Sequence, residues 1–244
     1  MLKIKIRFIE PGNQPYRRSL LNYFVYDKYI RTPSHGLMTL AAIVKRVEED
    51  VLIYSESISK INWSDVFDAD VIFISIFTFN AIRGYELAEH IRRNSRATVV
   101  IGGLHATLNY AEAASHCDYV LVGEGDETIL KLLRSIKSEE KVAFAGVAYK
   151  SEDQLIFTGR SEPPADIDVI PARGLLHNYR KMAGHSTVWP QVHASRGCPH
   201  KCDYCALVHA FGRGVRTRSP QNVVSDIKEA IAFHHDQNKR MAKV

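Results

Sequence analysis

Three of the chain's four cysteines lie within eight residues, in the stretch RGCPHKCDYCAL. Cys198, Cys202 and Cys205 follow the spacing C-x3-C-x2-C, so their thiolates can converge on one metal centre. Zinc is one candidate, with His200 or His209 as a fourth ligand, although its usual spacing is two C-x2-C pairs. A [4Fe-4S] cluster with three cysteine ligands is the other, and it leaves one iron open, as catalysis at a metal requires.

A second group of residues follows three predicted strands and could bind a ligand. The loops GGLHAT (102–107) and GEGDET (123–128) each follow a strand and open a helix, and SIFT (75–78) ends an apolar strand. Glycines allow close backbone approach and helix N-termini favour phosphate, but such loops also serve simply as tight turns. The candidate contacts are Ser75, Thr78, Gly102, Gly103, His105, Ala106, Thr107, Gly123, Glu124 and Gly125.

Residues 1–145 alternate short β-branched runs with amphipathic stretches, and they must position the second group. Strands are predicted over 3–10, 51–54, 70–77, 98–101 and 118–122, and helices after Ser34 and over 82–93, 107–115 and 126–137. Strands separated by helices need crossover connections. The prediction is therefore an α/β fold, a Rossmann-like doubly wound parallel sheet.

The remaining residues lack the regular alternation of strands and helices. Residues 146–160 predict a hairpin, and 161–174 are rich in proline and acidic residues, so 146–185 is interpreted as hairpin and linker. A strand predicted over 187–195 feeds into the cysteine loop within a third region, 186–244. A helix then begins with Ser219 as its cap and Pro220 in its first turn.

Composition indicates a cytoplasmic protein, because the N-terminus lacks the apolar region of a signal peptide and no run of about 18 apolar residues is present. In that compartment disulfides rarely persist.

Residues 170–244 carry 12 Lys and Arg against four Asp and Glu. We interpret this excess as a solvated face, or secondly as a surface for an anionic cofactor. No nucleic-acid partner is expected, because the arginines are scattered and no aromatic stacking pattern accompanies them.

The stretch CPHKCDYC, with an aromatic residue before its third cysteine, resembles the cluster loop of the radical S-adenosylmethionine (SAM) superfamily. This resemblance implies that Cys198, Cys202 and Cys205 ligate a [4Fe-4S] cluster at the start of a partial βα barrel. The open iron would bind the amino and carboxylate groups of SAM, with the backbone at Tyr204 near the adenine. An external one-electron donor of the flavodoxin or ferredoxin type would supply the electron that cleaves SAM to methionine and a 5′-deoxyadenosyl radical.

The order of features over nearly the whole chain resembles the cobalamin-binding-domain class of radical SAM enzymes. That order is a Rossmann-like domain with GGLHAT and GEGDET, a hairpin, a proline-rich linker and the cysteines; PSHGLMTLAA and RTRSPQNVVSDI also resemble segments of that class. The class includes methyltransferases acting on poorly activated carbons and the anaerobic ring cyclase of bacteriochlorophyll synthesis. The resemblance implies that cobalamin lies on 75–78, 102–107 and 123–128, and that the most plausible reaction is methyl transfer to a small-molecule substrate.

Two departures from that class leave alternatives open. The D-x-H-x-x-G motif of an axial histidine is absent, since His35 in SHG lacks the aspartate two positions before it, but cobalamin without such a histidine occurs in the class. A radical SAM barrel needs roughly 200 residues, so the chain is interpreted as the N-terminal part of a longer enzyme. The alternatives are a radical SAM cyclase or oxidative enzyme, and a non-catalytic cobalamin-binding module.

Overall fold

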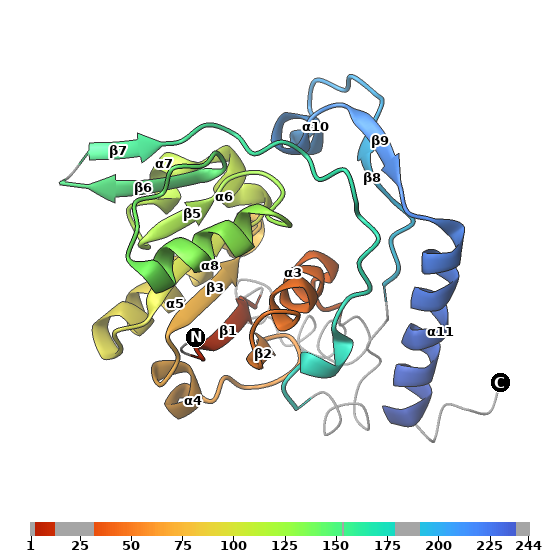
Figure 1. The fold of residues 1–244 in the computed structure, drawn as a ribbon, viewed down its shortest axis with the longest axis horizontal. Coiled ribbons are helices and arrows are strands. Elements are labelled where there is room, and N and C mark those ends of the chain that lie inside the picture. The colour runs from red at the N-terminus through yellow and green to blue at the C-terminus, as the bar shows by residue number, and fades with distance from the viewer. Residues whose placement is uncertain (1–2, 13–31, 153, 179–190, 238–244) are drawn as a thin grey trace, which may run out of the picture.

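The computed structural model describes residues 3–12, 32–152, 154–178 and 191–237, and Figure 1 shows their arrangement. Within these ranges, seven strands form one sheet in the order β2-β1-β3-β4-β5-β6-β7. The strands are β1 (Lys5–Glu10), β2 (Asp50–Ser55), β3 (Val71–Ser75), β4 (Thr98–Gly102), β5 (Tyr119–Leu121), β6 (Val147–Ser151) and β7 (Gln154–Phe157).

The first five strands are mutually parallel, and this confirms the predicted Rossmann-like fold. Their order, 2-1-3-4-5, is one of the two common doubly wound orders and makes β3 the central parallel strand. The predicted hairpin is present as β6 and β7, which pair antiparallel and continue the sheet beyond β5. Because β1 to β5 are parallel, the loops that follow them meet at one edge of the sheet, here called the carboxyl edge.

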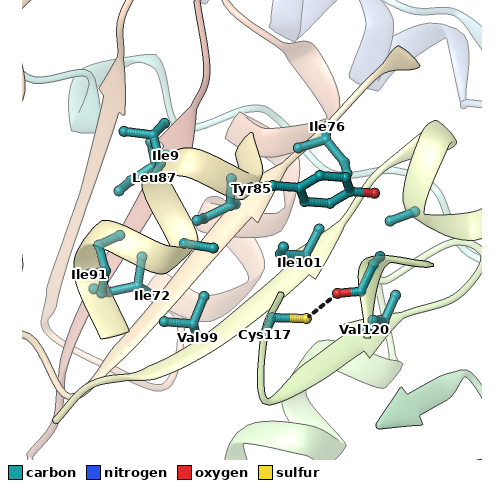
Figure 2. Close-up of a cluster of buried hydrophobic side chains, with 14 of the residues drawn as sticks. Ile9, Ile72, Ile76, Tyr85, Leu87, Ile91, Val99, Ile101, Cys117 and Val120 are labelled. Carbon is teal, nitrogen blue, oxygen red and sulfur yellow. Dashed lines mark hydrogen bonds between the residues drawn. The ribbon is translucent and has the colours of Figure 1, made fainter. Parts of the chain in front are cut away.

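Helices cover both faces of the sheet, as the near-continuous apolar strands require. α3 (His35–Lys45) and α8 (Thr128–Ser138) pack on one face together with Phe8 and Phe73. α4 (Trp63–Phe67), α5 (Ala81–Asn94), α6 (Leu104–Leu108) and α7 (Tyr110–Ala113) pack on the other, with Ile72 and Ile74. Successive strand residues alternate between the two clusters because side chains alternate across a strand. We call the buried cluster on the face of Ile72 and Ile74 the second core cluster; Figure 2 shows it, with Cys117 among its members.

The ends of two helices follow their predicted caps. Ser34 Oγ accepts a hydrogen bond of 3.3 Å from the Leu37 backbone and begins α3. Ser219 Oγ does the same for Asn222 at the start of α11 (Pro220–Gln237). Val47 lies beyond the end of α3 and is 54% exposed. No described helix has both the length and the apolar character that a membrane crossing needs.

The strand at the cysteine loop differs from the prediction. Residues 187–190 of the expected strand lie outside the described residues, and 191–194 are not in a strand. The strand is β8 (Ser195–Cys198), which pairs antiparallel with β9 (Gly214–Thr217) after α10 (Ala206–Phe211). We call β8 and β9 the ribbon. The ribbon requires glycine at position 197. Gly197 has φ +90°, and a Cβ there would lie 2.0 Å from the Gly214 carbonyl oxygen.

Candidate functional site

The carboxyl edge brings the ends of β3 and β4 into direct contact. Ser75 and Gly102 are register partners, and the Ile76 amide donates to the Gly102 carbonyl at 2.9 Å. The His105 amide donates in turn to the Ile76 carbonyl at 3.2 Å. Gly103 fits between them because it has φ +100° and no Cβ. The backbones of the predicted loops 75–78 and 102–107 are therefore hydrogen bonded to each other and form one surface at the carboxyl edge.

Replacing Gly103 with alanine should destabilise this surface. An alanine Cβ would lie 2.5 Å from the Ile76 oxygen and 2.9 Å from its nitrogen, in a conformation that L residues rarely adopt. We expect a loss of roughly 1–3 kcal/mol in the free energy of unfolding, measured by urea denaturation. Gly36→Ala is the control, because a Cβ there meets nothing within 4 Å. Equal stability of the two variants would show that the close approach at Gly103 is wrong.

Side chains from the predicted loops also meet. Thr78 Oγ1 lies 3.1 Å from His105 Nδ1, and the Gly123 amide donates to Thr107 Oγ1 at 3.0 Å. His105 is buried, and its Nε2 has no hydrogen-bond partner among the described residues. The nearest carboxylate contact of that nitrogen is Glu112, at 3.7 Å. This nitrogen is therefore a buried polar atom that the described fold leaves without a hydrogen bond.

Three other predicted contacts have local roles in the fold. Ala106 is fully buried in the second core cluster, and a Cβ at Gly125 would touch the side chain of Leu40. Glu124 points to the ribbon, where it forms ion pairs with Arg196 and Arg216. The prediction of a cofactor contact did not anticipate these pairs.

The three clustered cysteines lie at the end of β8 and in the loop between β8 and α10. Cys198 and Cys205 are half-buried, Cys202 is exposed, and all three are free thiols. The Cys205 amide donates to the Cys202 carbonyl at 3.1 Å, and the intervening Tyr204 is 91% exposed. No three metal-ligating side chains of the described residues, these cysteines included, are gathered as a metal site. The donor set nevertheless fits iron, because free thiols on one loop are the ligands of iron–sulfur clusters.

Cys117 provides the contrast with those thiols. Its side chain is buried in the second core cluster (Figure 2), and its Sγ lies within hydrogen-bonding distance of the backbone oxygens of Ala113 at 3.2 Å and Tyr119 at 3.1 Å. Burial raises the pKa of this thiol to about 12. A thiol that stays protonated is a poor metal ligand, so Cys117 belongs to the core.

The cysteine segment is docked on the carboxyl edge. Arg196, two residues before Cys198, donates to Glu124 at 2.9 Å and to both oxygens of Asp126 at 2.8 and 3.0 Å. Arg216 of β9 pairs with the same Glu124. α10 packs against α6, which carries the GGLHAT loop (Figure 1). The two groups of residues singled out in the sequence, far apart in the chain, therefore form one candidate site.

Glu10 and His35 complete the description of the site. Glu10 ends β1 and accepts hydrogen bonds from the Ser34 amide at 3.0 Å and Ser55 Oγ at 2.7 Å, and burial raises the pKa of its carboxyl to about 7. His35 is buried and stacks on His193 at 3.9 Å between ring centroids. Burial and then the charge of His193 lower the pKa of His35 to about 3, so its imidazole is neutral. Sequence reasoning missed Glu10, whose only signal is its place at a strand end.

Comparison with known protein families identifies the carboxyl-edge part of the chain. The B12 binding domain family matches residues 32–133, a range that contains β2 to β5 and all three predicted loops. Residues 32–133 are therefore similar to B12 binding domains.

Relatives extend beyond this B12 binding domain. Bacteriochlorophyllide d C-8(2)-methyltransferase of Chlorobaculum tepidum is 28% identical over 184 residues, covering 75% of this chain and 38% of that protein. The anaerobic magnesium-protoporphyrin IX monomethyl ester cyclase of Synechocystis is 28% identical over 136 residues, covering 53% and 27%. The B12 binding domain and these relatives confirm the resemblance to the N-terminal part of cobalamin-binding radical SAM enzymes.

A solved structure shows the same fold. The radical SAM methyltransferase TsrM from Kitasatospora setae, solved with cobalamin and a [4Fe-4S] cluster bound, superposes with a TM-score of 0.73 at 14% sequence identity. The match covers 95% of this chain and 47% of TsrM. The chain thus spans less than half the length of each of these three proteins.

Proposed function

We propose that this chain is the cofactor-binding, N-terminal portion of a cobalamin-dependent radical SAM methyltransferase. The observation that carries the proposal is the docking of the cysteine segment on the carboxyl edge of the B12 binding domain, through Arg196 and Arg216. A chemistry that uses both cofactors needs them close together, and this arrangement supplies a common site.

In this proposal cobalamin lies over 75–78, 102–107 and the start of the GEGDET loop, where His105 Nε2 offers an unsatisfied polar atom. Cys198, Cys202 and Cys205 hold the [4Fe-4S] cluster, and the backbone at Tyr204 lies beside SAM. When bound, the cluster supplies an electron and an open iron for SAM, and cobalamin supplies a carrier for the methyl group. The chain's own residues bind and orient these groups. The reaction acts on a small molecule in the cytoplasm and draws electrons from an external donor protein.

We propose a separate role for each of the three sequence regions. Residues 1–145 would bind cobalamin, and residues 186–244 would begin the SAM-binding part. Residues 146–185 would connect these two parts. The connecting segment makes a direct contact in the structure, since Ser161 Oγ donates to the Val122 and Glu124 carbonyls at 3.3 and 3.2 Å. It therefore lies against the same GEGDET loop on which the ribbon docks.

A ring-forming or oxidative radical SAM enzyme is the second candidate, and the cyclase relative favours it. The products made from SAM separate the candidates. After anaerobic reconstitution with iron, sulfide and hydroxocobalamin, the longer enzyme of which this chain is the proposed N-terminal portion is reduced and incubated with SAM, and the products are separated by chromatography. The chain alone should form little of either product, because most of the barrel is absent from it.

A methyltransferase should form both S-adenosylhomocysteine and 5′-deoxyadenosine, and both should depend on Cys202. 5′-Deoxyadenosine alone would favour the second candidate and contradict methyl transfer. Neither product from the longer enzyme, with cobalamin bound, would indicate a binding module and contradict both catalytic candidates. The matched control for all three outcomes is Cys117→Ala, which removes a thiol from the core.

A further inference from the structure

We propose that Glu124 and Asp126 are positioning residues that fix the cysteine loop relative to the carboxyl edge, through an ionic clamp to Arg196 and Arg216. This inference rests on the proposed function, because it assigns the clamp the role of setting the separation between the two cofactors. The four residues are here called the clamp.

The contacts of the clamp are specific in geometry. Arg196 makes a two-bond contact with Asp126 through Nη1 and Nη2, and its Nη1 also donates to Glu124. Arg216 Nη1 donates to Glu124 at 3.1 Å and to the Pro164 carbonyl at 3.2 Å, and its Nη2 pairs with the other Glu124 oxygen. Paired planar contacts of this kind fix orientation as well as distance.

The register of the ribbon shows that these arginines are not there to stabilise the ribbon itself. Arg196 and Arg216 are cross-strand partners in the β8–β9 pairing, so two positive charges lie opposite each other. Like charges in that relation destabilise a strand pair. Glu124 contacts both guanidinium groups and removes the repulsion only when the ribbon is docked on the sheet. The ribbon thus gains its charge balance from the B12 binding domain.

Burial strengthens the clamp beyond an ordinary surface ion pair. The side chains of Glu124 and Asp126 are 8% exposed, and those of both arginines are 23% exposed. Exposed pairs contribute little because water and salt screen them, whereas shielded pairs are screened much less. Docking is therefore expected to persist at physiological ionic strength.

The clamp connects the two ends of the proposed site through short, rigid links. On one side, Gly197 alone separates Arg196 from Cys198, and its backbone lies tightly against Gly214. On the other side, Gly123 precedes Glu124 directly and is hydrogen bonded to Thr107 of the GGLHAT loop. A displacement of about 1 Å in a reacting geometry can cost on the order of 10²-fold in rate, so links this short suit a positioning role.

The first test uses the chain without cofactors. Hydrogen exchange of the β8 and β9 amides is compared in wild type, Glu124→Gln, Arg216→Met and the control Arg213→Met. Arg213 is exposed directly before β9 and forms no ion pair with a described residue, so its loss removes the same charge beside the ribbon without touching the clamp. Glu124→Gln and Arg216→Met should exchange at least about tenfold faster at the ribbon, with β3 and β4 unchanged. Arg216→Lys, which keeps the charge, should fall between wild type and Arg216→Met.

The second test measures the separation of the cofactors. In a chain loaded with cob(II)alamin and a reduced [4Fe-4S] cluster, both centres are paramagnetic, so their dipolar coupling in electron paramagnetic resonance reports their distance. Arg216→Met should change or abolish the wild-type coupling while iron and cobalamin contents stay at wild-type levels.

Unchanged exchange at the ribbon would overturn the clamp, and unchanged coupling despite faster exchange would overturn its positioning role. A wild-type chain that holds only one of the two cofactors would contradict the proposed function and the positioning role with it. In that case exchange still decides whether the clamp exists, so the two failures are distinguishable.

Discussion

Replacing Asp226 with alanine is expected to lower the free energy of unfolding by about 3–5 kcal/mol. Asp226 lies in α11, is fully buried, and bridges Arg173 at 2.7 Å and Arg218 at 2.6 Å, both of them 3% exposed in their side chains. Its loss leaves two buried guanidinium groups without their shared carboxylate. Urea denaturation followed by circular dichroism measures the effect, and hydrogen exchange shows whether α11 opens first.

The control for this variant is Lys228→Ala, an exposed position on the same helix, which should change stability by at most about 0.5 kcal/mol. The triple variant Arg173→Met, Arg218→Met, Asp226→Leu should recover most of the lost stability, because removing a whole buried ion cluster is often neutral. A loss below about 1 kcal/mol for Asp226→Ala would contradict the account of how α11 is attached.

Replacing Cys202 with alanine is expected to abolish assembly of the iron–sulfur cluster. The wild-type chain, reconstituted anaerobically, should hold about four iron and four sulfide, and the variant should lose most of both because a ligand is missing. Cys198→Ala and Cys205→Ala should behave in the same way. Iron and sulfide analysis with visible absorption measures the result.

Cys117→Ala is the matched control, because it removes a thiol that the fold keeps buried and protonated. It should retain wild-type iron. Loss of iron in Cys117→Ala, or full iron in Cys202→Ala, would contradict the assignment of the three ligands. Zinc in place of iron would support the alternative in which His200 or His209 completes a zinc site.

The parallel sheet was predictable because its strands are short apolar runs and all but one of them precede an amphipathic stretch; the short α4, between β2 and β3, was not predicted. DVIFISIF, for example, contains β3, whose residues alternate between two cores. Helix caps at Ser34 and Ser219 were predictable for the same reason, since a cap depends on residues within one turn. Features of this kind depend on neighbouring residues in the chain, so the sequence alone predicts them.

The contacts that join the site were not predictable. Arg196 and Asp126 are 70 residues apart, and Arg216 and Glu124 are 92 apart, so no local pattern links them. The sequence predicts Glu124 as a cofactor contact because it follows a strand, and only the tertiary structure shows its pairing with the ribbon. Strand β8 was misplaced because Ser-Arg-Gly-Cys lacks the β-branched residues that mark strands, and its pairing depends instead on two glycines.

In the proposed function one chain holds cobalamin and an iron–sulfur cluster at the carboxyl edge. The most direct measurement is a titration of the anaerobically reconstituted chain with hydroxocobalamin, with iron, sulfide and zinc determined in the same sample. The account predicts about one cobalamin and about four iron per chain. A chain that binds iron but no cobalamin, or zinc in place of iron, would contradict it.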